Sequence, residues 1–152
     1  MDYIYLGEQL VYVLSSGLLS AAVSDTSSTI LSIMKNNVYY PQLNNVLEET
    51  DLYAKMNVIQ KLLENFPKEL EKNDIIKTTL SNMHDIIISI NNELQKIDNE
   101  INYHENYRYF SKWRTPHYKY NLKQLKKYKN ILDERFNTLI KLINILDKNK
   151  SN

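Results

Sequence analysis

The clearest pattern in the chain is a series of apolar residues that alternate in steps of four and three. This spacing keeps the apolar side chains on one side of an α-helix and is typical of helices that pack at shallow angles. The first series predicts a long helix over 74–112. Its members are Ile76, Leu80, Met83, Ile87, Ile90, Leu94, Ile97 and Ile101.

A second series of the same kind predicts a long helix over 115–148. Thr115–Pro116 is a strong start signal, because Thr caps helix N-termini and Pro is tolerated at the first helical position. Lys129 is the only polar member of the series. The members are Leu122, Leu125, Lys129, Leu132, Phe136, Leu139, Ile143 and Leu146.

The first half of the chain predicts shorter elements. Residues 46–65 predict a helix that ends at Phe66–Pro67, because the residue before a proline is disfavoured in the α region. Residues 36–45 contain Pro41 and four Asn and are expected to form a loop. Residues 1–35 predict one helix or a bent helix pair, with Leu18 and Ala21 on its apolar face together with Leu10 and Leu14.

These elements predict an all-α fold, an antiparallel bundle of about four helices. The chain has two Gly and three Pro, too few for the turns of a sheet protein. Residues 1–148 form the expected single domain, and residues 149–152 a disordered tail. Because the last two helices exceed the others in length, we expect them to form a protruding, coiled-coil-like hairpin. Pairing with a second copy, as a homo-oligomer, is the alternative.

An uncharged stretch near the start raises the question of a membrane segment. It lies between Glu8 and Asp25, and it contains Gln9 and four Ser residues. A spanning helix needs about 20 apolar residues, and a signal peptide needs basic residues before its apolar run. We therefore expect a buried helix with no membrane span, and a protein that is cytoplasmic, or in the virion if viral, and not secreted.

Catalytic and metal-binding motifs are absent from the sequence. It has no glycine-rich phosphate loop, no HExxH and no Cys. Glu100 and His104 share a helical face, but a di-metal bundle needs a Glu-x-x-His on each of two helices, and none occurs. We expect no enzyme, no metal and no cofactor.

Charge is distributed unevenly along the chain. Residues 1–106 carry 7 Lys and 15 Asp or Glu, whereas residues 107–152 carry 12 Lys or Arg and 3 Asp or Glu. The net charges of these parts are therefore −8 and +9. Such a division arises either when one helix is neutralised by its neighbours or when a basic surface binds a polyanion.

The stretch 103–130 combines the basic residues with half of the chain's aromatic residues. Three hypotheses stay open: an aromatic cap on the hairpin, a protein-binding tip, or a nucleic-acid site. Trp, Tyr and Arg dominate protein-binding hot spots, and the candidates of this type are Tyr107, Arg108, Phe110, Lys112, Trp113, Arg114 and Tyr118. Lysines that would contact phosphates lie at the start of the last helix, at Lys119, Lys123, Lys126 and Lys127.

Composition adds one indication of origin. Asn, Ile, Lys and Tyr are abundant, and all four are encoded by AT-rich codons. We therefore expect a structural or protein-interaction protein, a scaffold or adaptor, with a virion or assembly component of an AT-rich large DNA virus as one setting. The alternative is a nucleic-acid-binding accessory protein.

Overall fold

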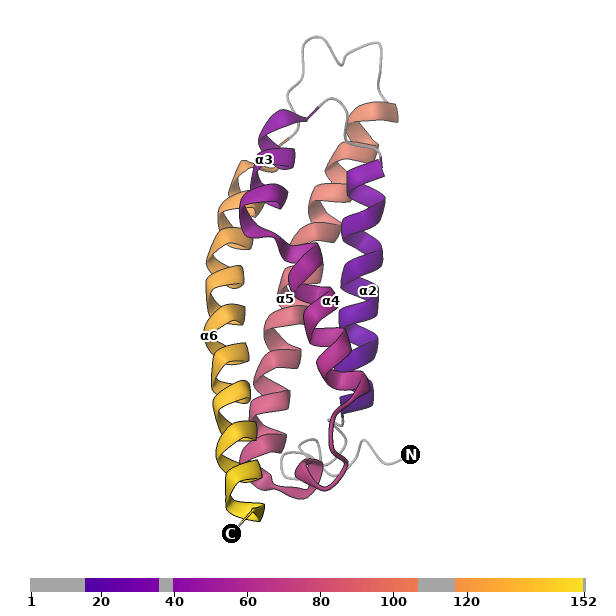
Figure 1. Cartoon of the computed structure of the whole chain (residues 1–152). Helices are drawn as coiled ribbons and strands as arrows, with labels where there is room; N and C mark the ends of the chain where they lie inside the picture. Colours follow the sequence, from indigo (N-terminus) through magenta and orange to yellow (C-terminus); the bar gives the residue numbers. More distant parts are fainter. Residues whose placement is uncertain (1–15, 36–39, 107–116, 152) are drawn as a thin grey trace, which may run out of the picture.

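A computed structural model describes residues 16–35, 40–106 and 117–151, and within them the fold is all-α. Successive passes of the chain along the bundle run in opposite directions, and the second pass consists of two helices in succession (Figure 1). The antiparallel bundle predicted from the sequence is thus confirmed. The helices are α2 (Ser16–Lys35), α3 (Pro41–Thr50), α4 (Leu52–Glu64), the short 3₁₀ helix η1 (Leu70–Lys72), α5 (Asp74–Asn106) and α6 (Lys119–Lys150).

Helix α5 is the centre of the bundle, because α2 and α6 both pack along it. Every member of the apolar series from Ile76 to Ile101 is buried. In α6, Leu122, Leu125 and Leu132 are buried as predicted, while Lys129 is half-buried. Local periodicity therefore predicted correctly which faces of the two long helices form the core.

The predicted second helix, 46–65, and the predicted loop, 36–45, are both wrong in their boundaries. Pro41 does not interrupt the chain but starts α3, since a proline in the first turn loses no helical hydrogen bond. The break comes instead at Asp51, whose φ of 48° is left-handed. Thr50 and Leu52 are both buried, so the break changes which face of the helix points inward. An unbroken helix would turn the exposed Ala54 toward the core in place of Leu52.

The expected apolar face of the first helix is also wrong within α2. Leu18 is 41% exposed and Ala21 is exposed, whereas Leu10 and Leu14 lie outside the described residues. The buried face passes through Thr26, whose hydroxyl donates to the Ala22 carbonyl oxygen at 2.8 Å. Because this hydrogen bond satisfies the hydroxyl, Thr26 packs in the core among apolar residues. The buried residues are Leu19, Ala22, Val23, Thr26, Ile30 and Ile33.

The end of α5 and the start of α6 lie at one end of the bundle (Figure 1). Helices α2 and α3 reach the same end of the bundle (Figure 1), and Tyr40 covers the last turn of α5. The Tyr40 ring is edge-on to His104, with ring centroids 6.3 Å apart, and its hydroxyl donates to Glu105 Oε1 at 2.7 Å. The expected hairpin tip, 107–116, lies outside the described residues.

At the opposite end, α6 is longer than predicted. Residues 149 and 150 were expected in a disordered tail but belong to the helix. Lys150 Nζ lies 2.8 Å from Glu69 Oε2, and the Ser151 backbone N–H donates to the Lys148 carbonyl oxygen at 3.2 Å. None of the helices in the described residues is long and apolar enough to cross a membrane.

Candidate functional site

Most of the predicted protein-binding residues lie outside the described part of the chain: Tyr107, Arg108, Phe110, Lys112, Trp113 and Arg114. Tyr118 is described, and it is buried at the start of α6. Its ring is edge-on to Tyr40, with centroids 6.1 Å apart, and burial raises the pKa of its phenol. In the structure, Tyr118 therefore packs within the bundle.

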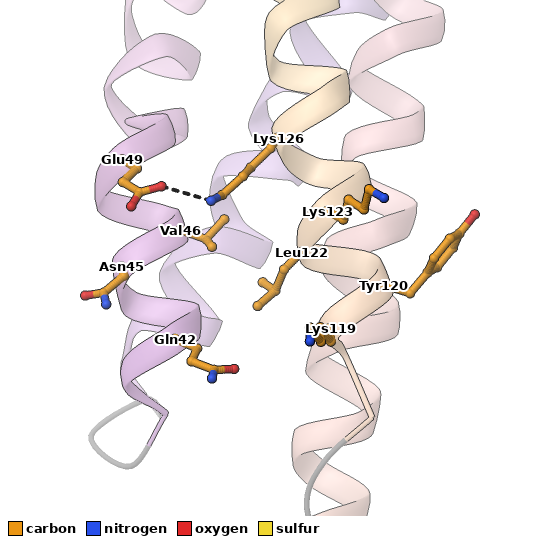
Figure 2. Close-up of a pocket in the computed structure, with 9 residues that line it drawn as sticks. All are labelled: Gln42, Asn45, Val46, Glu49, Lys119, Tyr120, Leu122, Lys123 and Lys126. Atoms are coloured by element: carbon orange, nitrogen blue, oxygen red, sulfur yellow. Dashed lines mark ion pairs between the residues drawn. The ribbon is translucent and has the colours of Figure 1, made fainter.

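The lysines at the start of α6 lie beside an open groove of about 680 Å³ between α3 and α6. We call it the lysine groove (Figure 2). It brings together three of the four lysines predicted for nucleic acid, whereas Lys127 is exposed outside it. Its residues are Gln42, Asn45, Val46 and Glu49 from α3, and Lys119, Tyr120, Leu122, Lys123 and Lys126 from α6.

Helical spacing explains how the α6 wall arises. On α6, Lys119, Lys123 and Lys126 follow one another in steps of four and three, so they share one face. The buried side chains of Val46 and Leu122 lie between the two helices and form the apolar floor. Tyr120 is 69% exposed and points away from α3 in Figure 2. The groove thus combines an apolar floor with a basic wall on α6, a polar wall on α3 and an aromatic ring at its edge.

Charge in the groove is only partly neutralised. Lys126 Nζ lies 3.1 Å from Glu49 Oε2, and both side chains are more than half exposed. Lys119 and Lys123 make no ion pair or hydrogen bond with any described residue. Three lysines and one glutamate leave a net charge of +2 among the lining residues.

The start of α6 is held to α5 on the side away from the groove. The Asn121 side-chain amide donates to Glu93 Oε2 at 2.7 Å, and Lys96 Nζ lies 3.2 Å from Glu93 Oε1. The His117 backbone N–H donates to Glu100 Oε1 at 3.0 Å. These contacts position the first turns of α6, and with them the lysines.

The α3 wall is attached through Tyr40, the residue before its first turn. Burial raises the pKa of the Tyr40 phenol well above its ordinary value, and the hydrogen bond to Glu105 raises it further. The phenol is therefore a hydrogen-bond donor at all physiological pH values. The α3 wall was not predicted from the sequence, because residues 36–45 were expected to form a loop. Pro41 was the available signal, since proline is common at the first position of a helix.

The Glu100–His104 pair does not form a metal site among the described residues. These residues contain no group of three or more His, Asp or Glu side chains arranged to hold a metal. Glu100 accepts the hydrogen bond from His117, and His104 is buried against Tyr40. Both side chains take part in packing at this end of the bundle.

A second lysine cluster lies farther along α6, and here both lysines are paired with a carboxylate. Asp133 on α6 accepts from Lys129 at 2.7 Å and from Lys55 of α4 at 3.2 Å. Lys55 Nζ also lies 4.2 Å from the centre of the Phe136 ring. We call these residues the Asp133 cluster; it joins α4 to α6.

Comparisons with known proteins identify no relative: no family model, no curated protein and no solved structure matches this chain significantly.

Proposed function

We propose that this chain is a non-enzymatic protein-interaction component, a scaffold or adaptor, that binds a protein partner through the lysine groove. One observation carries the proposal: Lys119 and Lys123 have no ionic partner among the described residues, and they stand beside an apolar floor and an exposed Tyr120. An exposed tyrosine beside an apolar floor is typical of protein contacts, where Tyr is enriched among the residues that carry binding energy.

The predicted contact residues of the stretch 107–114 belong to the same proposal. They precede α6 directly in sequence, so a partner that contacts Lys119 and Tyr120 has them within a few residues. Trp113 and Phe110 are the proposed anchors there, and Arg108 and Arg114 would pair with carboxylates, since Trp and Arg are enriched in binding hot spots. The proposed setting is an assembly in the cytoplasm, or in a virion if the gene is viral.

A photo-crosslinking residue placed at position 120 tests the proposal in extract of the native host. We expect protein adducts from position 120 and none from position 145, where Ile145 is 56% exposed near the other end of α6. Equal adducts from both positions, or none from position 120, would contradict a contact at the groove.

Nucleic-acid binding is the second candidate, and a specific observation favours it. Lys119, Lys123 and Lys127 are all without an ionic partner among the described residues, and Tyr120 is exposed enough to stack on a base. Three phosphate contacts to a single strand predict that log K falls with log salt with a slope of about −2. No retention of single-stranded DNA or RNA at low salt removes this candidate.

A further inference from the structure

We infer that the lysine groove takes an acidic amphipathic helix, which sets one apolar side chain on Val46 and Leu122 and pairs its carboxylates with Lys119 and Lys123. The inference rests on the proposed function and specifies its partner. Three observations carry it: the spacing of the two lysines, the apolar floor between the helices, and the position of Glu49.

Spacing determines the shape of the ligand. Lys119 and Lys123 are four residues apart on α6, about one helical turn of 5.4 Å. Carboxylates at positions i and i+4 of a bound helix are separated by the same rise, so a helix lying along α6 matches both lysines at once. From Lys119 to Lys126 the basic side is about 10 Å long, which accommodates about two turns of ligand.

The floor determines what lies between the carboxylates. Val46 and Leu122 close the groove with apolar side chains, and the aliphatic stems of the lysines add apolar surface on one side. An apolar side chain three or four residues from each carboxylate lies on the adjoining face of the same ligand helix. Apolar grooves between helices commonly bind amphipathic helices.

Glu49 distinguishes a peptide from a polyanion. Its carboxylate projects into the groove toward Lys126, and the pair is exposed enough to contribute little to stability (Figure 2). A nucleic-acid strand running the length of the groove would place phosphates next to this carboxylate. A peptide, by contrast, presents acidic residues only at Lys119 and Lys123 and a neutral residue near Glu49. The observations therefore favour an acidic peptide over nucleic acid.

A peptide-display selection tests the inference without knowledge of the natural partner. The probe is a library of random peptides of about 15 residues, roughly 22 Å long when helical. We expect wild-type protein to enrich peptides with acidic residues at i and i+4 and an apolar residue between them. Enrichment of basic or uncharged peptides would overturn the inference.

Charge exchange then locates the site. For a synthetic enriched peptide, we expect Lys119→Glu with Lys123→Glu to weaken binding by about tenfold or more, measured by fluorescence anisotropy. Replacing the two peptide carboxylates by Lys should restore the affinity to the doubly substituted protein. The matched control is Lys141→Glu with Lys148→Glu, which makes the same change in net charge at exposed positions elsewhere on α6.

A folding control and several binding results decide the outcome. Unaltered thermal unfolding of both double variants, followed by circular dichroism, shows that lost binding is not lost folding. Equal loss in the control variant, or no loss in the groove variant, overturns the inference. Tighter binding of a single-stranded oligonucleotide than of any selected peptide overturns it in favour of nucleic acid. If position 120 forms protein adducts but the selection enriches no acidic peptides, the inference is wrong and the proposed function stands. If there are neither adducts nor acidic peptides, the proposed function is wrong as well.

Discussion

Helix α6 carries lysines in two regions that differ in one respect. In the Asp133 cluster, Lys129 and Lys55 share a carboxylate and are each less than a third exposed. In the lysine groove, Lys119 and Lys123 are exposed and have no such partner among the described residues. The lysines are therefore paired with a carboxylate in the first region, whereas Lys119 and Lys123 are left available in the second.

Packing explains the difference. Helix α4 packs mainly on α2, and its Lys55 side chain reaches across to Asp133 of α6. The Lys55 ammonium group also covers the Phe136 ring. Helix α3 lies against the start of α6 and contributes one carboxylate, Glu49, which pairs with Lys126. Lys119 and Lys123, which have no such partner among the described residues, are free to bind another molecule.

The largest expected effect comes from a residue that supports both regions. Leu125 is fully buried on α6 between Lys123 and Lys129. We expect Leu125→Ala to lower the free energy of unfolding by about 2–5 kcal/mol, because it removes buried methyl groups and leaves a cavity. Urea denaturation measures the change. The control is Ile145→Ala at an exposed position; similar losses in both variants would show that α6 is not packed as described.

The Asp133 cluster should show a moderate effect. Asp133→Asn removes the charge that Lys55 and Lys129 share, and we expect a loss of about 1 kcal/mol, since solvent screening weakens partly exposed pairs. Glu134→Gln is the matched control, because this neighbour is exposed and makes no ion pair with a described residue. If both variants unfold at the same urea concentration, the cluster does not stabilise the fold.

Acid should remove the stability that the Asp133 carboxylate contributes. Partial burial raises the pKa of the Asp133 carboxyl, but hydrogen bonds from Lys129 and Lys55 outweigh burial and hold the pKa below its ordinary value of 3.8. A lowered pKa stabilises the folded state above the ordinary value, and this contribution is lost as pH falls through the folded-state pKa. The stability difference between wild type and Asp133→Asn should therefore stay constant near neutral pH and shrink below pH 3.8. A difference that persists at the lowest pH at which the protein folds would exclude the charge as its cause.

The smallest effect on stability is expected in the lysine groove. Replacing Lys119 and Lys123 by Ala breaks no ion pair with a described residue, so we expect the free energy of unfolding to change by less than about 0.5 kcal/mol. The same variant should lose the adducts formed at position 120. Lys55→Ala with Lys129→Ala is the comparison, because it strips Asp133 of both partners. If the Lys119/Lys123 variant were as destabilised as the Lys55/Lys129 variant, the two regions would not differ in their contribution to stability.

Part of this arrangement follows from local pattern alone. The apolar series from Ile76 to Ile101 predicted the buried face of α5, because side chains three and four residues apart meet on one side of any helix. The break at Asp51 did not follow, since left-handed backbone is usually marked by Gly or Asn. Thr26 was passed over for a similar reason: its hydroxyl is satisfied within its own helix, which no hydropathy pattern reports.

Only one wall of the candidate site was predicted from the sequence. The lysines at the start of α6 were identified from charge and spacing, but the wall opposite them was not, because α3 was expected as a loop. The structure also separates Lys126, which has a partner on α3, from Lys119 and Lys123, which have none among the described residues. All three lysines lie in the same basic stretch of sequence, so composition alone does not distinguish the paired lysine from the two unpaired ones.

By itself, then, the sequence determined the helical class, the two long helices and the faces that they bury, because these depend on residues within a few turns of one another. Tertiary structure alone decided which lysines are paired with a carboxylate. Lys55 and Asp133 are distant in sequence, and their ion pair exists only because the bundle brings α4 within reach of α6. Ion pairs require atoms within a few ångströms, and that proximity is a property of the packed bundle.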